Sequence, residues 1–298
     1  MGQFSRRDFM AITAAGAALA SRDGAFASTR QDGARAGAAV TAQDVIDRIK
    51  KNVGVEWRAE TVDTFKAGNP SAAVTGIVTT AMATLAVLNQ AVKAGANLVI
   101  TCEPTFYSRA EKAALADAVF TAKDELIKRH GFAVWRFSDH WRLRKPDPLA
   151  QGFADAFGWS KYQSADDPAR LSISPMTLDA VASHVKHALH ARGGIRVIGD
   201  PNAEIRTIGL LPGNTPIQAA LQLLPSVDAI IGGEVREWES AEYVRDKVTA
   251  GEKKSLILVG RVLSEEPGMK LCAQWLETIV PELETTWIRV GDPYWRPV

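Results

Sequence analysis

The sequence has little cysteine, almost no net charge and no long apolar run. Its 298 residues include two cysteines, Cys102 and Cys272, which are too few for a disulfide framework. The formal net charge is +1 and no cluster of basic residues occurs, so we expect no nucleic-acid partner. No stretch reaches the roughly 18 apolar residues that a membrane-spanning helix requires. These absences predict a soluble protein.

The first 27 residues have the zones of an export signal. Arg6 and Arg7 lie in SRRDF, an alanine-rich apolar run follows, and Ala25-Phe26-Ala27 forms a small-residue cleavage site. Paired arginines in this setting are typical of proteins exported in the folded state. We therefore predict a twin-arginine signal peptide over 1–27, the twin-arginine export machinery as a partner, and a periplasmic or other extracytoplasmic location. The alternative is a short amphipathic helix.

The rest of the chain predicts an α/β fold, because apolar segments with strand and helix periodicity alternate. Residues 28–40 are rich in Gly and Ala and predict a flexible lead-in. The predicted helices cover 42–52, 83–94, 108–131, 215–226 and the segment after a turn up to 280. The predicted strands cover 74–80, 97–101, 132–138, 205–213, 228–235, 255–260 and an edge strand at 285–292.

Two parts of the chain share one plan, in which a strand, a helix that begins near threonine, a second strand and an acid follow one another. We predict an internal duplication with related halves at about 41–160 and 195–298. Glu103 and Glu234 then occupy matching strand ends. Ligand sites in such folds lie at the carboxyl ends of strands. The acids predicted at these ends are Glu103, Asp139, Glu234 and Glu265.

Each motif around these acids has two interpretations. Cys102 and Glu103 are either metal ligands or the polar start of a loop. Pro104 favours an extended Glu103, so we expect the side chains of Cys102 and Glu103 on opposite sides of the chain. Asp139 and His140 are a ligand with its orienting partner, a general base with its partner, or a solvated loop.

The later motifs also allow structural interpretations. Two glycines before Glu234 allow the backbone to approach closely, while the acid itself suits the start of a helix. Ser264 predicts a helix N-cap with Glu265 in the first turn. The histidines of HVKHALH have three-residue spacing and predict a solvated helix, because the zinc-binding helix motif needs a spacing of four.

Taken together, four motifs resemble one family. In order, VITCEPTF, DHW…PDPLAQG, GGEVREWE and LVGRVLSEEPG are similar to those of the Nif-three-like proteins, also labelled GTP cyclohydrolase type-two homologues. The resemblance covers most of residues 41–298. It implies a duplicated αβ fold, a dinuclear metal centre and a homohexameric ring.

Two positions depart from that pattern, because Cys102 and Arg261 replace histidines of the family motifs. The resemblance implies metal ligands at Glu103, Glu265 and an aspartate, either Asp139 or Asp147, with Cys102 as the candidate fourth. A thiolate would favour a softer ion, whereas a guanidinium stays protonated and cannot be a ligand. We therefore expect one divalent ion per chain (zinc, iron or manganese) rather than two, or none.

These observations lead to competing functional hypotheses. The leading one is a metal-dependent hydrolase of a small molecule, in which a bound ion activates water. Glu234 or His140 would be the base, and Arg261 and Arg142 would hold an anionic group of the substrate. The alternative is a non-catalytic ring-forming scaffold or small-ligand binder that has lost its metals. A third hypothesis is metal delivery outside the cytoplasm.

Overall fold

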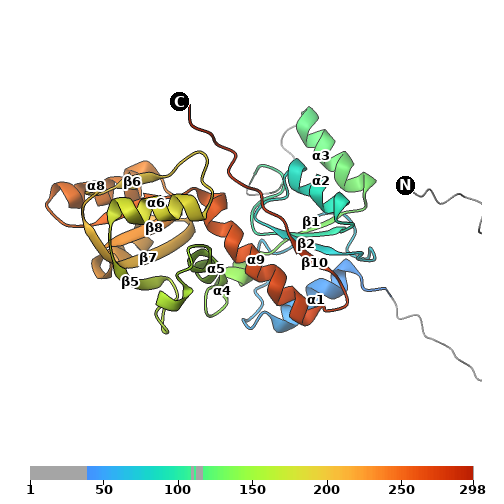
Figure 1. The fold of residues 1–298 in the computed structure, drawn as a ribbon. Coiled ribbons are helices and arrows are strands. Elements are labelled where there is room, and N and C mark those ends of the chain that lie inside the picture. The colour runs from blue at the N-terminus through green and yellow to red at the C-terminus, as the bar shows by residue number, and fades with distance from the viewer. Residues whose placement is uncertain (1–38, 109–110, 112–116, 298) are drawn as a thin grey trace, which may run out of the picture. The chain divides into compact units, whose positions relative to one another are not determined.

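Figure 1 shows the fold in a computed structural model, which describes residues 39–108, 111 and 117–297. The predicted signal peptide, most of the predicted lead-in and much of the start of the predicted helix 108–131 lie outside these residues. Within the described residues, no helix combines the length and the apolar character that crossing a membrane would require.

The first of two five-stranded sheets has the strand order β1-β4-β3-β2-β10. Its strands are β1 (Phe65–Ala67), β2 (Ile77–Thr80), β3 (Leu98–Thr101), β4 (Ala133–Arg136) and β10 (Thr285–Trp287). All are parallel except β1, which pairs with β4 in the antiparallel direction. Every residue of β2, β3 and β4 is buried, as expected for parallel strands covered on both faces.

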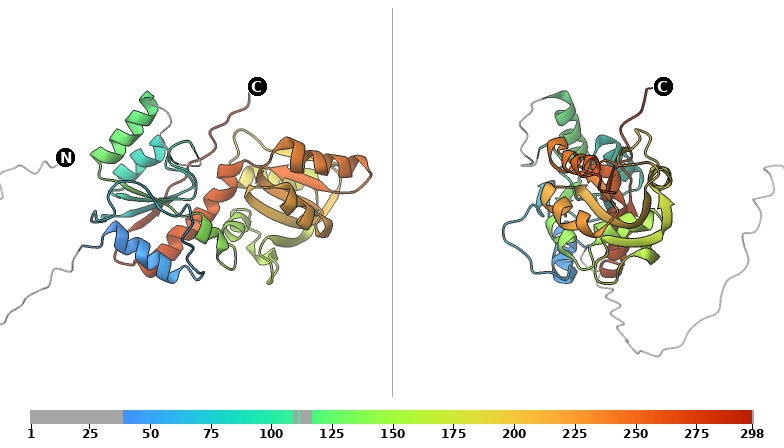
Figure 2. Two further views of the ribbon diagram at one scale, coloured as in Figure 1. Left: turned by 180° about the vertical axis from the view of Figure 1, so that it is seen from behind. Right: turned by 90° about the vertical axis from the view of Figure 1, so that its left-hand side faces the viewer.

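Alternate residues of these strands face different helices. The helices are α1 (Ala42–Asn52), α2 (Leu85–Lys93), α3 (Ala118–Arg129) and α9 (Arg261–Ile279). Ile77, Leu98 and Trp135 pack with α1 and α9, whereas Val78 and Val99 pack with α2 and α3. Figure 2 shows α2 and α3 on one side of this sheet and α1 on the other. Because successive side chains of a strand point to opposite faces of the sheet, the same strands contribute to the hydrophobic cores on both faces.

The second sheet has the order β5-β7-β8-β9-β6, with β7, β8 and β9 parallel to one another. Its strands are β5 (Arg170–Thr177), β6 (Arg196–Ile198), β7 (Glu204–Asn214), β8 (Ala229–Glu234) and β9 (Ser255–Leu258). The helices around it are α5 (Pro148–Ala156), α6 (Leu178–Ala188), α7 (Ile217–Leu223) and α8 (Glu242–Thr249). α5 and α6 supply one core, and α7 and α8 supply the other.

The topology confirms the predicted duplication. In each half, three parallel strands are joined by two helices, and a short antiparallel strand, β1 or β6, pairs with the third of them. Glu103 follows β3 and Glu234 ends β8, so the two acids occupy matching positions.

The last part of the chain departs from the predicted halves. α9 contacts β7 and β8 of the second sheet, but also β2 of the first sheet, and β10 then pairs with β2. Figure 1 shows α9 running between the two sheets. The segment predicted to belong to the second half therefore returns to the first, and β10 lies at an edge as expected.

Candidate functional site

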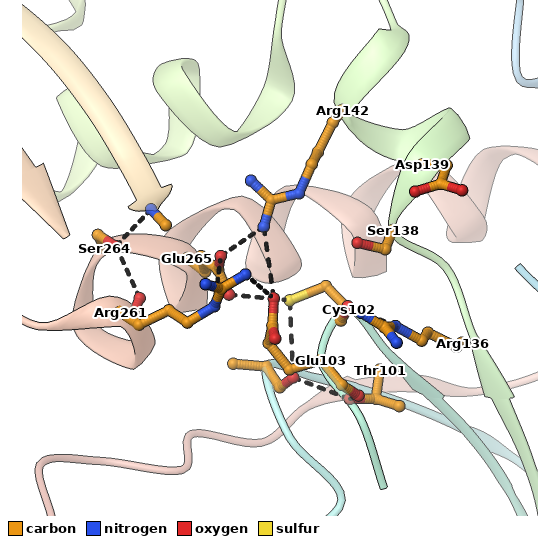
Figure 3. A network of polar contacts seen from close by, with 12 residues as sticks. Thr101, Cys102, Glu103, Arg136, Ser138, Asp139, Arg142, Arg261, Ser264 and Glu265 are labelled. Carbon is orange, nitrogen blue, oxygen red and sulfur yellow. Dashed lines mark hydrogen bonds and ion pairs between the residues drawn. The ribbon is translucent and has the colours of Figure 1, made fainter. Parts of the chain in front are cut away.

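Five charged side chains converge from the carboxyl ends of four strands. Figure 3 shows Glu103, Arg142, Arg261 and Glu265 among them. Glu103 follows β3, and Arg142 lies in the short helix α4 (Asp139–Leu143) that follows β4. Glu234 is the last residue of β8, and Arg261 and Glu265 lie in the first turns of α9, after β9. Each half of the duplication thus contributes an arginine and at least one acid to the same cluster.

Arg261 binds acids from both halves at once. Its Nη1 donates to Glu234 Oε1 at 2.7 Å and its Nη2 donates to Glu103 Oε1 at 2.9 Å. Its Nε lies 3.5 Å from Glu265 Oε1. Burial alone would lower the pKa of Arg261, but Glu265 and Glu103 outweigh burial and raise it. The guanidinium is therefore a fixed positive charge.

Arg142 is a second fixed cation against the same acids. Its Nη2 donates to Glu265 Oε1 and lies 3.6 Å from Glu103 Oε1. Burial opposes its charge, but Glu265 more than compensates and the pKa of Arg142 is raised. The side chains of Glu103 and Glu265 are only 7% and 0% exposed, so these two cations replace the water that the carboxylates lose.

Cys102 joins this cluster, which corrects the expectation that it points away from Glu103. β3 ends at Thr101 and the chain bends at residues 102 and 103, so both side chains reach the same site. Cys102 Sγ lies 3.6 Å from Glu265 Oε2. Burial and then Glu265 raise the pKa of Cys102 well above its usual value, so it is a thiol rather than a thiolate. Burial also raises the pKa of Glu265, to about 7, although Arg142 opposes the rise.

The start of α9 explains how Arg261 and Glu265 come together. The helix begins at Arg261, after Gly260 with φ +92°, so Ser264 is not the predicted N-cap. The Ser264 hydroxyl instead donates to Arg261 O at 2.6 Å and accepts from Gly213 N at 2.8 Å. Residues four apart share a helix face, which places Arg261 beside Glu265.

Glycines make room for the cluster. A Cβ on Gly213, whose φ is +82°, would lie within 3.0 Å of Glu265 Oε1 and 3.1 Å from Arg142 Nη1. A Cβ on Gly233 would lie within 3.0 Å of Gly213 O. The close backbone approach predicted for the glycines before Glu234 is therefore confirmed.

Gly213→Ala should lower the free energy of unfolding more than Gly251→Ala. Both glycines have positive φ, +82° and +89°, but a Cβ on Gly251 meets nothing within 4 Å. The control should lose about 1–2 kcal/mol from the left-handed backbone alone. Gly213→Ala adds a clash with the Glu265 carboxylate. Urea unfolding of both variants checks this, and equal losses would contradict it.

His140 lies apart from the cluster in a buried network of its own. Its side chain is 0% exposed, with Nδ1 2.7 Å from Asp63 Oδ2. Nε2 accepts the backbone N–H of Arg58 at 2.9 Å, and the ring stacks on Trp57. The Asp63 carboxylate also accepts the backbone N–H groups that begin α4. Both ring nitrogens of His140 are engaged, so the side chain fixes the position of α4 rather than acting as a base. Asp63, which no sequence motif indicated, holds the start of α4 in place.

The two candidate aspartates are held by other groups. Asp139 Oδ2 accepts from Thr61 Oγ1 at 2.9 Å and from Val62 N at 3.0 Å. Burial acts to raise the pKa of Asp139, but these hydrogen bonds outweigh it and the pKa is lowered. Asp147 caps α5 by accepting from Leu149 N at 2.9 Å, and burial raises its pKa.

A cavity of about 480 Å³ adjoins the cluster. Glu103, Arg142, Glu234 and Arg261 all line it. Among the described residues that line it, all except Val62 and Pro104 are polar or charged. The volume is in the range of small-molecule sites, but the lining is far more polar than usual.

The donor set fits a divalent metal ion poorly. Sulfur or oxygen atoms of Cys102, Glu103 and Glu265 lie within 4.8 Å of one another, which is close enough for shared ligation. However, Glu103 Oε1 and Glu265 Oε1 already contact both guanidinium groups, and Cys102 keeps its proton. An ion at these acids would therefore lie beside two guanidinium groups that repel it.

A profile of the Duf34/NIF3 family (NGG1p interacting factor 3) matches residues 40–293. The chain belongs to this family. The predicted resemblance to Nif-three-like proteins is therefore confirmed, and so is the α/β fold.

Solved structures of NIF3-related and other proteins share the fold at low sequence identity. A Bacillus cereus protein related to NIF3 matches with TM-score 0.67 and 13% identity, over 86% of this chain and 99% of that one. The Staphylococcus aureus hypothetical protein SA1388 matches with TM-score 0.66 and 16% identity, over 87% and 100%. Reduced HcgD from Methanocaldococcus jannaschii matches with TM-score 0.57 and 13% identity, over 83% and 97%. A comparison with curated proteins gives no match.

Proposed function

We propose that this Duf34/NIF3 protein binds a small polar molecule at a site that needs no metal. The observation that carries the proposal is the position of Arg261, which bonds Glu103 and Glu234 at 2.9 and 2.7 Å and lies 3.5 Å from Glu265. A fixed cation stands among the acids that a metal ion would otherwise neutralise. Arg142 contacts Glu103 and Glu265 in the same way.

Electrostatics favours this arrangement over a dication. Two unit charges 4 Å apart interact by about 4 kcal/mol at an effective dielectric constant near 20, and a divalent ion doubles the repulsion from each guanidinium. Glu265, with a pKa raised to about 7 by burial, supplies only part of a negative charge at neutral pH. The arginines therefore leave little negative charge to attract a metal.

We propose that the ligand binds in the cavity beside these charged side chains. Glu234 is 49% exposed at its side chain and Arg261 is 29% exposed, so both present charge to a ligand while they stay paired. Polar groups that are already oriented by their neighbours need little reorganisation on binding.

The second candidate is a hydrolase with one divalent ion, zinc, iron or manganese. It is favoured by the three donors of Cys102, Glu103 and Glu265 that lie within 4.8 Å of one another. In that case Glu234, which lines the cavity, would be the base, because His140 is enclosed.

Metal content separates the two candidates. The protein is purified without chelator, incubated with zinc, iron(II) or manganese, desalted and measured by plasma mass spectrometry. We expect well below one ion per chain. Retention of one ion, lost in a Glu103→Gln variant, would support the hydrolase and contradict the metal-free site.

Export and assembly are separate parts of the proposal. With residues 1–27 as a twin-arginine signal, replacing Arg6 and Arg7 by lysine should keep the protein in the cytoplasm, as checked by cell fractionation. Periplasmic accumulation of that variant would contradict this route. Light scattering of the purified protein tests the predicted hexameric ring, which a monomeric mass would contradict.

A further inference from the structure

The lining of the cavity has balanced charge of both signs. The charged residues that line it are three arginines and three acids: Arg136, Arg142, Arg261, Glu103, Asp139 and Glu234. Among the described residues, no aromatic ring lines the cavity. A nucleobase would find no ring to stack on, and more of the lining surface is polar than apolar. Both features favour a small charged ligand that adds no net charge.

One end of the cavity offers hydrogen-bond donors. Ser138 is 5% exposed, and its hydroxyl makes no hydrogen bond to another described residue. Figure 3 shows this hydroxyl directed toward the side of Arg142 and Glu103. Arg142 N donates to Ser138 O at 3.1 Å, so the two side chains are neighbours one helical turn apart. The hydroxyl lines the cavity without a partner among the described residues, and an anionic group beside the Arg142 guanidinium would supply one.

The opposite half contributes an acceptor end. Glu234 Oε1 receives Arg261, whereas Glu234 Oε2 accepts no hydrogen bond from any described residue. Asn214 pairs with Glu234 between β7 and β8, and its side-chain amide likewise makes no hydrogen bond to a described residue. A half-exposed carboxylate with one unused oxygen suits an ammonium group.

Resting on the proposed metal-free site, the geometry points to a small zwitterion that carries a carboxylate and an ammonium as the ligand. The carboxylate lies against Ser138 and Arg142, and the ammonium lies against Glu234. Such a molecule satisfies both ends and leaves the charge balance of the arginines and acids unchanged.

The test uses probes that differ only in their charged ends. Isothermal titration compares γ-aminobutyrate, 5-aminopentanoate and 6-aminohexanoate with the alkanoate and the alkylamine of the same length. We expect at least one amino acid to bind about tenfold or more tightly than its two matched analogues, because each loses one charge-assisted hydrogen bond. Analogues that bind as tightly as the amino acid, or a series that does not bind at all, would overturn the assignment.

Variants then locate each end. Glu234→Gln should weaken the amino acid about tenfold and leave the alkanoate unchanged, while Ser138→Ala should weaken both. Glu237→Gln is the matched control, because Glu237 pairs with Arg196 at the surface and does not line the cavity. Equal effects of Glu234→Gln and Glu237→Gln would contradict the placement. Metal content is measured on the same sample: a bound ion defeats the proposed function, whereas a metal-free protein that binds none of the probes defeats only the ligand class.

Discussion

If the natural site holds no metal, as we propose, replacing Cys102 and Arg261 together by histidine should create a metal site. The double variant removes the guanidinium that binds Glu103 and Glu234 and places imidazoles beside the two buried acids. Imidazole and carboxylate ligands suit zinc, iron and manganese. We expect retention after desalting to rise from well below one ion per chain to one or more, as measured by plasma mass spectrometry.

A control variant, Arg261→Gln, distinguishes the effect of the added histidine ligands from the effect of removing the positive charge that repels a metal ion. Arg261→Gln removes the same positive charge without supplying an imidazole. If repulsion alone excludes metal, Arg261→Gln will retain as much as the double histidine variant. We expect much less, because Cys102 stays a protonated thiol and no imidazole ligand is supplied. An equal metal content in the natural protein and the double variant would refute the exclusion of metal by Arg261.

The parts of the fold that depend on local pattern could be predicted from the sequence. Apolar runs and helical periodicity located β3, β8 and the helices between the parallel strands, and the repeated order placed Glu103 and Glu234 at matching strand ends. The short strands β1 and β6 were not predicted, because each has three residues and none of them is fully buried. A period of two cannot be detected over such a length.

The chemistry of the site depends on contacts between distant segments. That Arg261 is not a metal ligand followed from its charge alone. The simultaneous bonds to Glu103 and Glu234 require α9 to lie between the two sheets, which no local pattern shows. The contact between Cys102 and Glu265, which follows from the bend after Thr101, likewise joins segments that are far apart in the sequence.

Arg142→Ala should destabilise the protein strongly at high pH and only weakly at low pH. The variant leaves the carboxylate of Glu265, 0% exposed, with Arg261 as its remaining cation, 3.5 Å away. Breaking a buried ion pair costs about 3–5 kcal/mol of unfolding free energy, since one charge stays buried without its partner. Arg196→Ala is the control, because its pair with Glu237 is exposed and contributes at most about 1 kcal/mol.

The sign of the pH dependence follows from the raised pKa of Glu265. Its pKa is about 7 in the native protein against an ordinary value of 4.5, so the native state binds this proton more tightly than the unfolded chain. The contribution of Glu265 to the free energy of unfolding is therefore fully present below pH 4.5 and is lost as the pH rises toward 7. Without Arg142, which opposes the rise, the pKa moves higher and the fall continues above pH 7.

Urea unfolding at pH 5 and pH 8 measures this difference, and the double variant Arg142→Ala/Glu265→Gln tests its origin. Glutamine carries no charge at either pH, so the double variant should lose the additional pH dependence. A loss from Arg142→Ala that is equal at both pH values would mean that packing of the arginine side chain, not the charge it pairs with on Glu265, stabilises this cluster.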